Sequence, residues 1–188
     1  MNNQVLIIES RNLDDISKNI HEGHTLQEIL RMQGVSSVYY EVTTQEYLEY
    51  ALSLAADDSF KYIHISAHGC KKGFELTNGD FISWDCFDSI AWPHIKNKCL
   101  VFSSCDVAKG VHEVFSKHKT LCNAVVAPSR KISWSEGVVA YSVFYYLATK
   151  PESGTKYDLK LMNSITEPGT FKLIKADTAV DKKIFALD

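Results

Sequence analysis

The sequence lacks most of the features that would assign a chain to a special class. Its 188 residues contain no internal repeat, no low-complexity tract and no Pro- or Gly-rich linker between domains. No run approaches the roughly 20 apolar residues of a membrane-spanning helix, and no basic leader precedes an apolar segment at the start. We therefore expect a single domain over residues 1–188, soluble and cytoplasmic.

Charge, motifs and cysteine usage argue against further classes. The formal net charge is only −3 and the basic residues are scattered, so the sequence does not predict nucleic-acid binding. There is no glycine-rich phosphate loop or other cofactor motif, and we expect no cofactor. His64 and His68 lie about 13 Å apart along a predicted strand, too far for one metal ion. The five cysteines are odd in number and form no CxxC pair, which favours free thiols.

What the sequence does contain is an alternation of apolar runs and helical patterns. Hydrophobic residues make up 45% of the chain, near the average for globular proteins, so a compact core is expected. Continuous apolar strands separated by helices predict a mostly parallel α/β sheet with helices on both faces. Strands are expected at 4–8, 37–42, 61–67, 98–104, 123–129 and 170–176, and helices at 25–34, 47–56, 83–91, 107–115, 134–148 and 156–165.

Local signals place several element boundaries. Three pairs have the spacing of a helix capping box, in which a hydroxyl and a Glu three residues later cap the first turn. The pairs are Thr25 with Glu28, Thr43 with Glu46, and Ser133 with Glu136. Asn78-Gly79 separates residues 74–77 from 80–83 and predicts a hairpin with a tight primed turn.

Chemically capable residues follow two of the buried strands. His68-Gly69 ends the run 61–67, and Cys105 ends the run 98–104. Parallel sheets bind ligands at the carboxyl ends of their strands, so a thiol and an imidazole are expected to meet there. A helix beginning after Cys105 would favour its thiolate through the helix dipole. The backbone N–H groups of Gly69 and Cys105 are candidate donors of an oxyanion hole.

The order and spacing of these motifs resemble a known family. An apolar strand ending in His-Gly, followed by one ending in "SSCD", is similar to the caspase-like (clan CD) cysteine peptidases, most closely their CHAT-domain branch. Residues 124–147, "AVVAPSRKISWSEGVVAYSVFYYL", resemble the strand, loop and helix that follow the nucleophile there. The resemblance spans about 60–148. It implies a caspase-like three-layer sandwich with a central sheet of about six strands and a small β-hairpin insert after the catalytic histidine.

The resemblance also implies roles for individual residues. Cys105 would be the nucleophile that forms a thioester, and His68 would protonate the leaving amine and activate water. Ser103, two positions before the nucleophile, would help to line the pocket for the side chain preceding the cleaved bond. Ser129 and Arg130, in the loop after the next strand, would line the same pocket.

Two departures from the family pattern leave the substrate open. Trp134 stands where an acidic residue is usual, and Arg130 stands where a Trp is common. Arg130 with Lys131 would favour an acidic or polar substrate side chain, whereas Trp134 would favour an apolar one. Asp106 is either an orienting carboxylate or a helix cap, and its position favours the cap.

The expected function is that of a cysteine endopeptidase cleaving a specific protein substrate. The resemblance implies activation by a partner protein within a bacterial antiviral-defence or cell-death system, with the 70–82 hairpin or the 129–135 loop misplaced until then. The alternatives are a catalytically silent docking or regulatory module of the same fold, and a non-proteolytic thiol hydrolase or acyltransferase.

Overall fold

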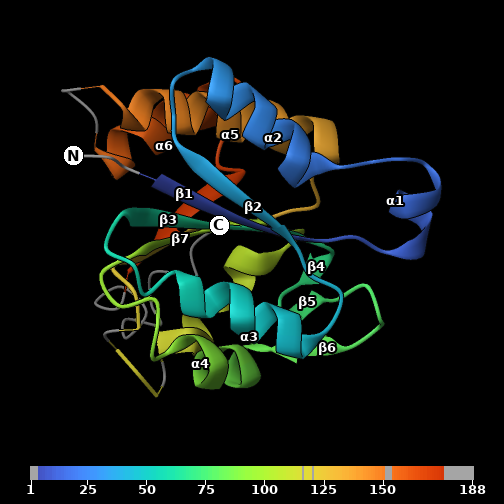
Figure 1. The fold of residues 1–188 in the computed structure, drawn as a ribbon. Coiled ribbons are helices and arrows are strands. Elements are labelled where there is room, and N and C mark those ends of the chain that lie inside the picture. The colour runs from blue at the N-terminus through green and yellow to red at the C-terminus, as the bar shows by residue number, and fades with distance from the viewer. Residues whose placement is uncertain (1–3, 116, 120, 151–153, 176–188) are drawn as a thin grey trace.

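A six-stranded sheet forms the centre of the molecule (Figure 1). The computed structural model describes residues 4–175, apart from 116, 120 and 151–153. The strands of the central sheet are β1 (Gln4–Ser10), β2 (Ser37–Glu41), β3 (Phe60–Ala67), β7 (Cys99–Ser103), β8 (Ala124–Pro128) and β9 (Phe171–Ile174). Their order across the sheet is β2-β1-β3-β7-β8-β9. All neighbours are parallel except β9, which is antiparallel to β8.

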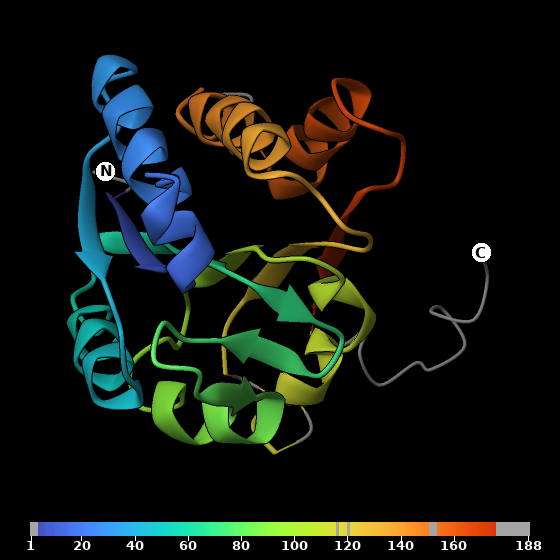
Figure 2. The same ribbon diagram turned by 90° about the vertical axis from the view of Figure 1, so that its right-hand side faces the viewer.

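Helices cover both faces of this sheet, as expected from the alternating pattern. One face carries α2 (Glu22–Met32), α5 (Trp134–Ala148) and α6 (Thr155–Ser164), and the other carries α3 (Gln45–Leu54) and α4 (Trp84–Ala91) (Figures 1 and 2). Two buried clusters fill the spaces between the layers. Successive strand residues contribute to opposite clusters, since Ile63 belongs to one and Tyr62 to the other.

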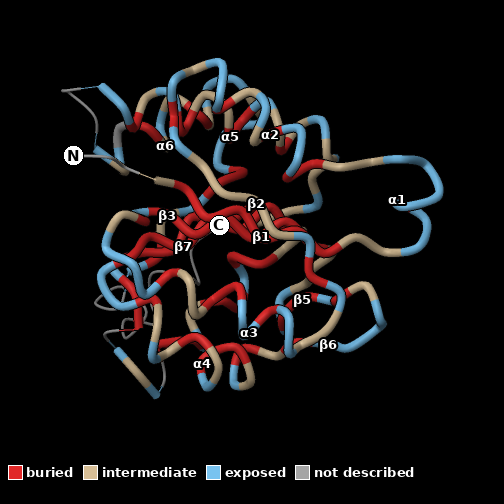
Figure 3. The backbone as a smooth tube through the Cα atoms, in the orientation of Figure 1, coloured by how far each residue is buried: buried red, intermediate tan, exposed pale blue. Residues whose placement is uncertain are grey.

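The central strands are buried on both faces, which is why they read as continuous apolar runs (Figure 3). In β3 only Lys61 is exposed, and β7 and β8 have no exposed residue. No helix among the described residues is both long enough and apolar enough to cross a membrane.

A small antiparallel sheet follows His68, in agreement with the expected hairpin insert. It consists of β4 (Gly69–Cys70), β5 (Gly73–Glu75) and β6 (Phe81–Ser83). The predicted tight primed turn at Asn78-Gly79 is wrong, because only Gly79 has a positive φ, of 89°. The turn is wider, and the Gly79 amide donates to the Leu76 carbonyl at 2.9 Å.

The predicted cap at Ser133 is confirmed, and the predicted cap at Thr43 is wrong by one residue. Ser133 caps α5, and its hydroxyl accepts from the Glu136 amide at 3.2 Å. The cap of α3 is Thr44 rather than Thr43, and it accepts from the Tyr47 amide at 3.4 Å. Adjacent threonines compete for this role, so sequence spacing alone does not choose between them.

The predicted cap at Thr25 is wrong, because α2 begins three residues earlier, at Glu22. Its first amides are capped by a side chain from β1. The carboxylate of Glu9 accepts from the amides of Gly23 at 2.8 Å and His24 at 3.3 Å. Thr25 lies inside the first turn, where its hydroxyl donates to the carbonyl of His21. A cap supplied from another element leaves no local signal.

A short helix between β1 and α2 was not predicted. α1 (Leu13–Ser17) projects beyond the carboxyl end of β1 (Figure 1). Asn12 and Asp15 form its capping box, with the Asn12 side chain accepting from the Asp15 amide at 2.8 Å. Asp15 is the buried residue of this helix, whereas Leu13 and Ile16 are exposed.

The predicted helix at 107–115 is replaced by two 3₁₀ turns, η1 (Val107–Lys109) and η2 (Val111–Phe115). The predicted apolar face is nevertheless buried, as all four of its residues show: Val107, Val111, Val114 and Phe115. The break falls at Gly110, which lies against the β4–β5 hairpin. A Cβ atom there would come within 1.6 Å of the Lys71 carbonyl oxygen.

Replacing Gly110 with Ala should therefore destabilise the fold by about 3 kcal/mol, since backbone on both sides must move to admit a methyl group. Urea unfolding of the full chain measures this change. Gly154→Ala is the matched control, because no neighbouring group among the described residues lies within 4 Å of its added Cβ. Equal unfolding midpoints for the two variants would contradict the contact with the hairpin.

Candidate active site

The register between β3 and β7 brings the predicted pair of residues side by side. Tyr62 pairs with Cys99 and Ser66 with Ser103, at an offset of 37 positions in every pair. His68 and Cys105 differ by the same 37 and follow the last pair by two residues. Adjacent parallel strands lie about 4.8 Å apart, so the two residues occupy equivalent places at one edge of the sheet.

The glycine after His68 packs against the residue before Cys105. A Cβ on Gly69 would come within 2.8 Å of the Ser104 Cβ and 3.1 Å of the Val107 side chain. Only a residue without a side chain allows so close an approach of the two segments. The strand ends therefore remain in contact beyond the ladder itself.

The imidazole of His68 is held by two neighbours from distant parts of the chain. Its Nε2 atom lies 2.6 Å from Oδ2 of Asp15, a side chain that is only 6% exposed. The indole N–H of Trp134 donates to the other oxygen of Asp15 at 3.0 Å. The Trp134 ring also meets the His68 ring edge to face, with centroids 5.1 Å apart. His68 itself remains 41% exposed, so a substrate can reach it.

The thiol of Cys105 points toward the loop after β8. Its S–H donates to the Ile132 carbonyl at 3.5 Å, and the residue is half-buried. Among the described residues no hydrogen bond joins Cys105 to His68, and none engages Nδ1 of His68. The thiol and the imidazole are neighbours without direct bonding.

The segment after Cys105 differs from the expectation. Because η1 has only three residues, the predicted helix dipole behind the thiol is wrong. Asp106 has a positive φ of 60° and makes no capping hydrogen bond. Its carboxylate pairs with Lys109 at 2.6 Å, so the preferred interpretation as a helix cap is also wrong. Its amide donates to the Arg130 carbonyl at 3.2 Å, which fixes the turn that follows the thiol.

The amides of Gly69 and Cys105 were predicted to form an oxyanion hole, which requires that their N–H groups are not already bonded to backbone carbonyls. The Glu75 amide donates to the His68 carbonyl at 2.9 Å. Bonded and non-bonded pairs alternate in antiparallel ladders, so the next pair, Gly69 with Phe74, is non-bonded. The ladder thus leaves the Gly69 amide free, and among the described residues no backbone carbonyl accepts from the Cys105 amide.

Of the four residues predicted to bind substrate, Trp134 is the one in contact with His68. Ser103 is fully buried and donates to Glu22 at 3.1 Å, an environment that disfavours contact with a substrate. The Ser129 hydroxyl donates to the carbonyls of Gly169 and Thr170 at 3.0 and 3.1 Å.

The fourth of these residues, Arg130, is occupied by the protein itself. Its guanidinium pairs with Glu136 and, at 2.9 Å, with Glu167. It also donates to the Thr170 hydroxyl at 2.9 Å. Two carboxylates therefore neutralise the charge that was expected to attract an acidic substrate; Glu136 ties the loop after β8 to α5, and Glu167 ties it to the turn before β9.

Sequence reasoning missed Asp15 as a neighbour of His68. The spacing of Asn12 and Asp15 was a usable signal, because it matches a capping box. That signal predicts a helix start and says nothing about a contact with a histidine 53 positions away. The described residues contain no group of three or more His, Cys, Asp or Glu side chains arranged to hold a metal ion.

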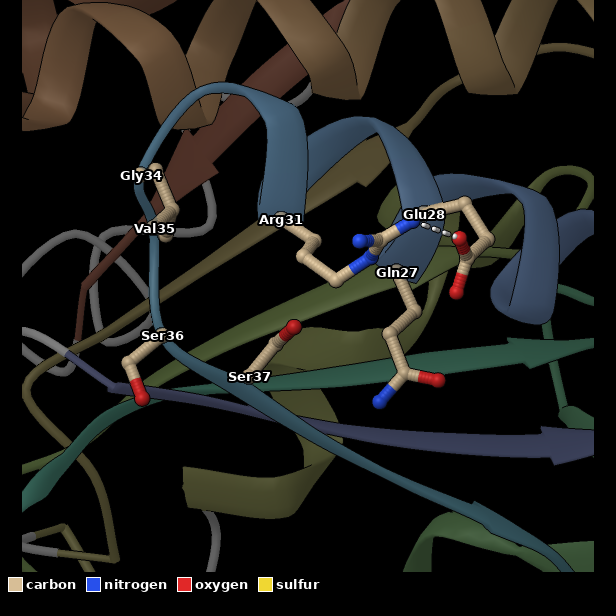
Figure 4. A pocket seen from close by; sticks show the side chains of 7 residues that line it. All are labelled: Gln27, Glu28, Arg31, Gly34, Val35, Ser36 and Ser37. Atoms are coloured by element: carbon tan, nitrogen blue, oxygen red, sulfur yellow. Dashed lines mark hydrogen bonds and ion pairs between the residues drawn. The ribbon is translucent and has the colours of Figure 1, made fainter.

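A surface hollow of about 470 Å³ lies away from this site (Figure 4). It is lined by the end of α2 and the start of β2, which is the amino end of that strand. The Arg31–Glu28 ion pair crosses one side of it. Since His68 and Cys105 follow the carboxyl ends of β3 and β7, this hollow is on the opposite edge of the parallel sheet.

Comparison with known proteins identifies the architecture. No family model matches the chain, and no curated protein matches it. Among solved structures, it is similar to the complex of the RgpB pro- and mature domains from Porphyromonas gingivalis, with a TM-score of 0.56 and 11% sequence identity. The fold is caspase-like. The match covers 86% of this chain and 43% of that one, so the chain spans less than half the length of its neighbour.

The cysteines of this caspase-like fold differ in burial, and the buried thiols are expected to react more slowly with electrophiles. It raises the pKa of Cys99 to about 12 and also raises the pKa of Cys122. A raised thiol pKa leaves little thiolate near pH 8, the form that reacts with electrophiles. Cys70 and Cys105 are only half-buried.

Iodoacetamide at pH 8 should therefore modify Cys99 on the order of a thousandfold more slowly than Cys70 in the native chain, as the low thiolate fraction requires. Peptide mass spectrometry after timed labelling measures both rates. Labelling in urea serves as the control, because unfolding should remove the difference. Equal native rates would contradict the burial of Cys99.

Proposed function

We propose that this chain is a cysteine peptidase with Cys105 as nucleophile and His68 as proton carrier. The observation that carries the proposal is the shared register of the two residues at the carboxyl edge of β3 and β7. The fold is similar to that of the RgpB complex, and RgpB is a cysteine protease. This similarity supports peptide-bond hydrolysis by a cysteine as the proposed reaction. The substrate is proposed to be a protein.

The reaction proceeds through two acyl transfers. The sulfur of Cys105 bonds to the scissile carbonyl carbon while His68 takes up the thiol proton. The carbon–nitrogen bond breaks, and the departing amine takes that proton from His68, leaving a thioester. His68 then removes a proton from water, which attacks the thioester, releases the new carboxyl group and returns the proton to the thiol. The Gly69 and Cys105 amides are the proposed donors to the developing oxyanion.

Asp15 and Trp134 are proposed as positioning residues for His68. The Asp15 carboxyl oxygen accepts from Nε2–H, which leaves the Nδ1 lone pair of His68 available to take a proton. The indole N–H of Trp134 fixes the other oxygen of Asp15 and so keeps the carboxylate from turning away. The arrangement selects one tautomer of the imidazole.

The resting contacts of the thiol favour control by a partner. The Ile132 carbonyl holds the Cys105 proton, and that carbonyl belongs to the loop that Arg130 fastens to Glu136 and Glu167. We propose that an activating protein moves this loop so that a substrate can enter, as in a CHAT-type peptidase of a cytoplasmic antiviral-defence system. Thiol activation would then need only His68, whereas substrate turnover would need the partner as well.

A catalytically silent docking module is the second candidate. It is favoured by the missing hydrogen bond between His68 and Cys105 among the described residues. The two candidates differ in whether His68 activates the thiol.

In the free chain, Cys105 should react with iodoacetamide at pH 7 at least about tenfold faster than Cys70, because an adjacent imidazole accepts its proton. His68→Ala should remove the difference. His94→Ala is the control, since this histidine lies in another part of the fold. A Cys105 rate that is the same with and without His68 would favour the docking module.

Turnover should appear when the chain is combined with the protein products of neighbouring genes. A fragment of one of these proteins is expected with the wild type and with neither Cys105→Ala nor His68→Ala. Cys86→Ala should leave the fragment unchanged. Gel electrophoresis followed by sequencing of the new amino terminus measures this. A fragment that forms equally with Cys105→Ala would rule out this nucleophile.

Asp15→Asn should slow the alkylation of Cys105 by roughly tenfold, because an amide N–H facing Nε2 forces the proton of His68 onto Nδ1, the nitrogen that must accept the thiol proton. The matched control is Asp14→Asn, one residue away, whose exposed carboxylate pairs with Lys18 on the surface. Identical rates for the two variants would show that Asp15 does not set the tautomer.

A further inference from the structure

A buried polar cluster lies behind the proposed nucleophile and takes no direct part in its chemistry. Glu22, at the start of α2, is 2% exposed, and one of its oxygens accepts from the Ser103 hydroxyl at 3.1 Å. Its other oxygen lies 3.5 Å from Nε2 of His64, which is fully buried. This second oxygen of Glu22 and the Nε2 atom of His64 both lack a hydrogen-bond partner among the described residues.

This single carboxylate contacts both strands of the proposed site. Ser103 lies in β7 two positions before Cys105, and His64 lies in β3 four positions before His68. Both Ser103 and His64 contact Glu22 and so face the layer of helices that contains α2 and α5, and His68 contacts Trp134 of the same layer. Glu22 of α2 thus bridges β3 and β7 on the face of the sheet that α2 covers.

Helix α5 packs closely against the hydrogen bond between Ser103 and Glu22. A Cβ on Gly137 would come within 2.8 Å of the Ser103 hydroxyl and 3.3 Å of the Glu22 oxygen. One turn later, the hydroxyl of Tyr141 donates to the carbonyl of Phe102. The end of β7 is therefore anchored at 102 and 103 from the helical layer.

We propose that Glu22 is a positioning residue that sets the place of Cys105 relative to His68, and this inference rests on the proposed function. Burying a carboxylate is unfavourable, and a well-packed apolar side chain would stabilise the layer at least as well. What an apolar residue cannot do is hold the Ser103 hydroxyl in one orientation. The hydrogen bond from the Ser103 hydroxyl to Glu22, 3.1 Å long and out of contact with water, restrains the strand two residues before the thiol.

The test compares four variants of the full chain by the alkylation of individual cysteines. Glu22→Leu removes the acceptor, Ser103→Ala removes the donor, and Gly137→Ala pushes the two apart by contact. Each should slow iodoacetamide labelling of Cys105 about tenfold, since small displacements of a reacting group are costly. Glu22→Gln keeps an oxygen for Ser103 and should restore a rate within about twofold of the wild type by the same argument.

Glu28→Gln is the control from the same helix, because Glu28 is exposed and pairs with Arg31. The rates of Cys99 and Cys122 in each sample separate positioning from loosening. A loosened fold exposes these buried thiols and raises their rates, whereas lost positioning lowers the rate of Cys105 alone. Thermal unfolding of each variant is followed in parallel.

The outcomes are distinct. Slow Cys105 labelling in the first three variants, with Cys99 and Cys122 still protected and Glu22→Gln restored, supports the proposal. Folded variants that label Cys105 at the wild-type rate overturn it, and so does a change confined to faster labelling of Cys99 and Cys122. A wild-type rate no higher than that of His68→Ala instead overturns the proposed function on which the inference rests.

Discussion

The parallel pairing of β3 with β7 is the constraint on which the rest of the site depends. A constant offset of 37 residues places His68 opposite Cys105 and lets Gly69 pack against Ser104. Side chains alternate along a strand, so a slip of one residue would turn one of the two groups to the other face of the sheet. The burial of both strands fixes that register, because a slip would also move each side chain into the opposite buried cluster, where its packing partners differ.

The fold and the two central residues, His68 and Cys105, could be predicted from the sequence for the same physical reason. Strands buried on both faces read as continuous apolar runs, and helices between them follow a 3.6-residue period, so the layers were predictable. His68 and Cys105 stood out because each follows such a run. Asp15 did not, since its contact with His68 joins segments 53 positions apart and its own helix exposes Leu13 and Ile16. The start of α2 was missed likewise, because Glu9 caps it from another strand.

The expected substrate pocket shows where family resemblance stops being informative. Ser103, Ser129 and Arg130 occupy positions that the resemblance assigned to substrate binding, yet their polar atoms are engaged within the protein. Whether a polar side chain is free depends on partners that lie far away in sequence. Arg130 is neutralised by Glu136 from the next helix and by Glu167 from beyond α6. Arg130 therefore offers no unpaired positive charge within the described residues, whereas Trp134 contacts the His68 ring.

Three buried carboxylates lie near this edge of the sheet: Glu9 caps α2, whereas Glu22 and Asp15 contact the strand ends that carry the proposed site. Burial raises the pKa of Glu9, which is the signature of a charge placed where solvation is poor. Glu22 and Asp15 are buried as well. Glu22 accepts from Ser103, two residues before Cys105, and Asp15 contacts His68 directly. A docking module needs a shaped surface, and apolar side chains would supply it without the desolvation penalty. Glu22 holds the Ser103 hydroxyl and Asp15 holds the His68 imidazole, which is the arrangement that the proposed catalysis requires, because it needs Cys105 and His68 in one relative orientation.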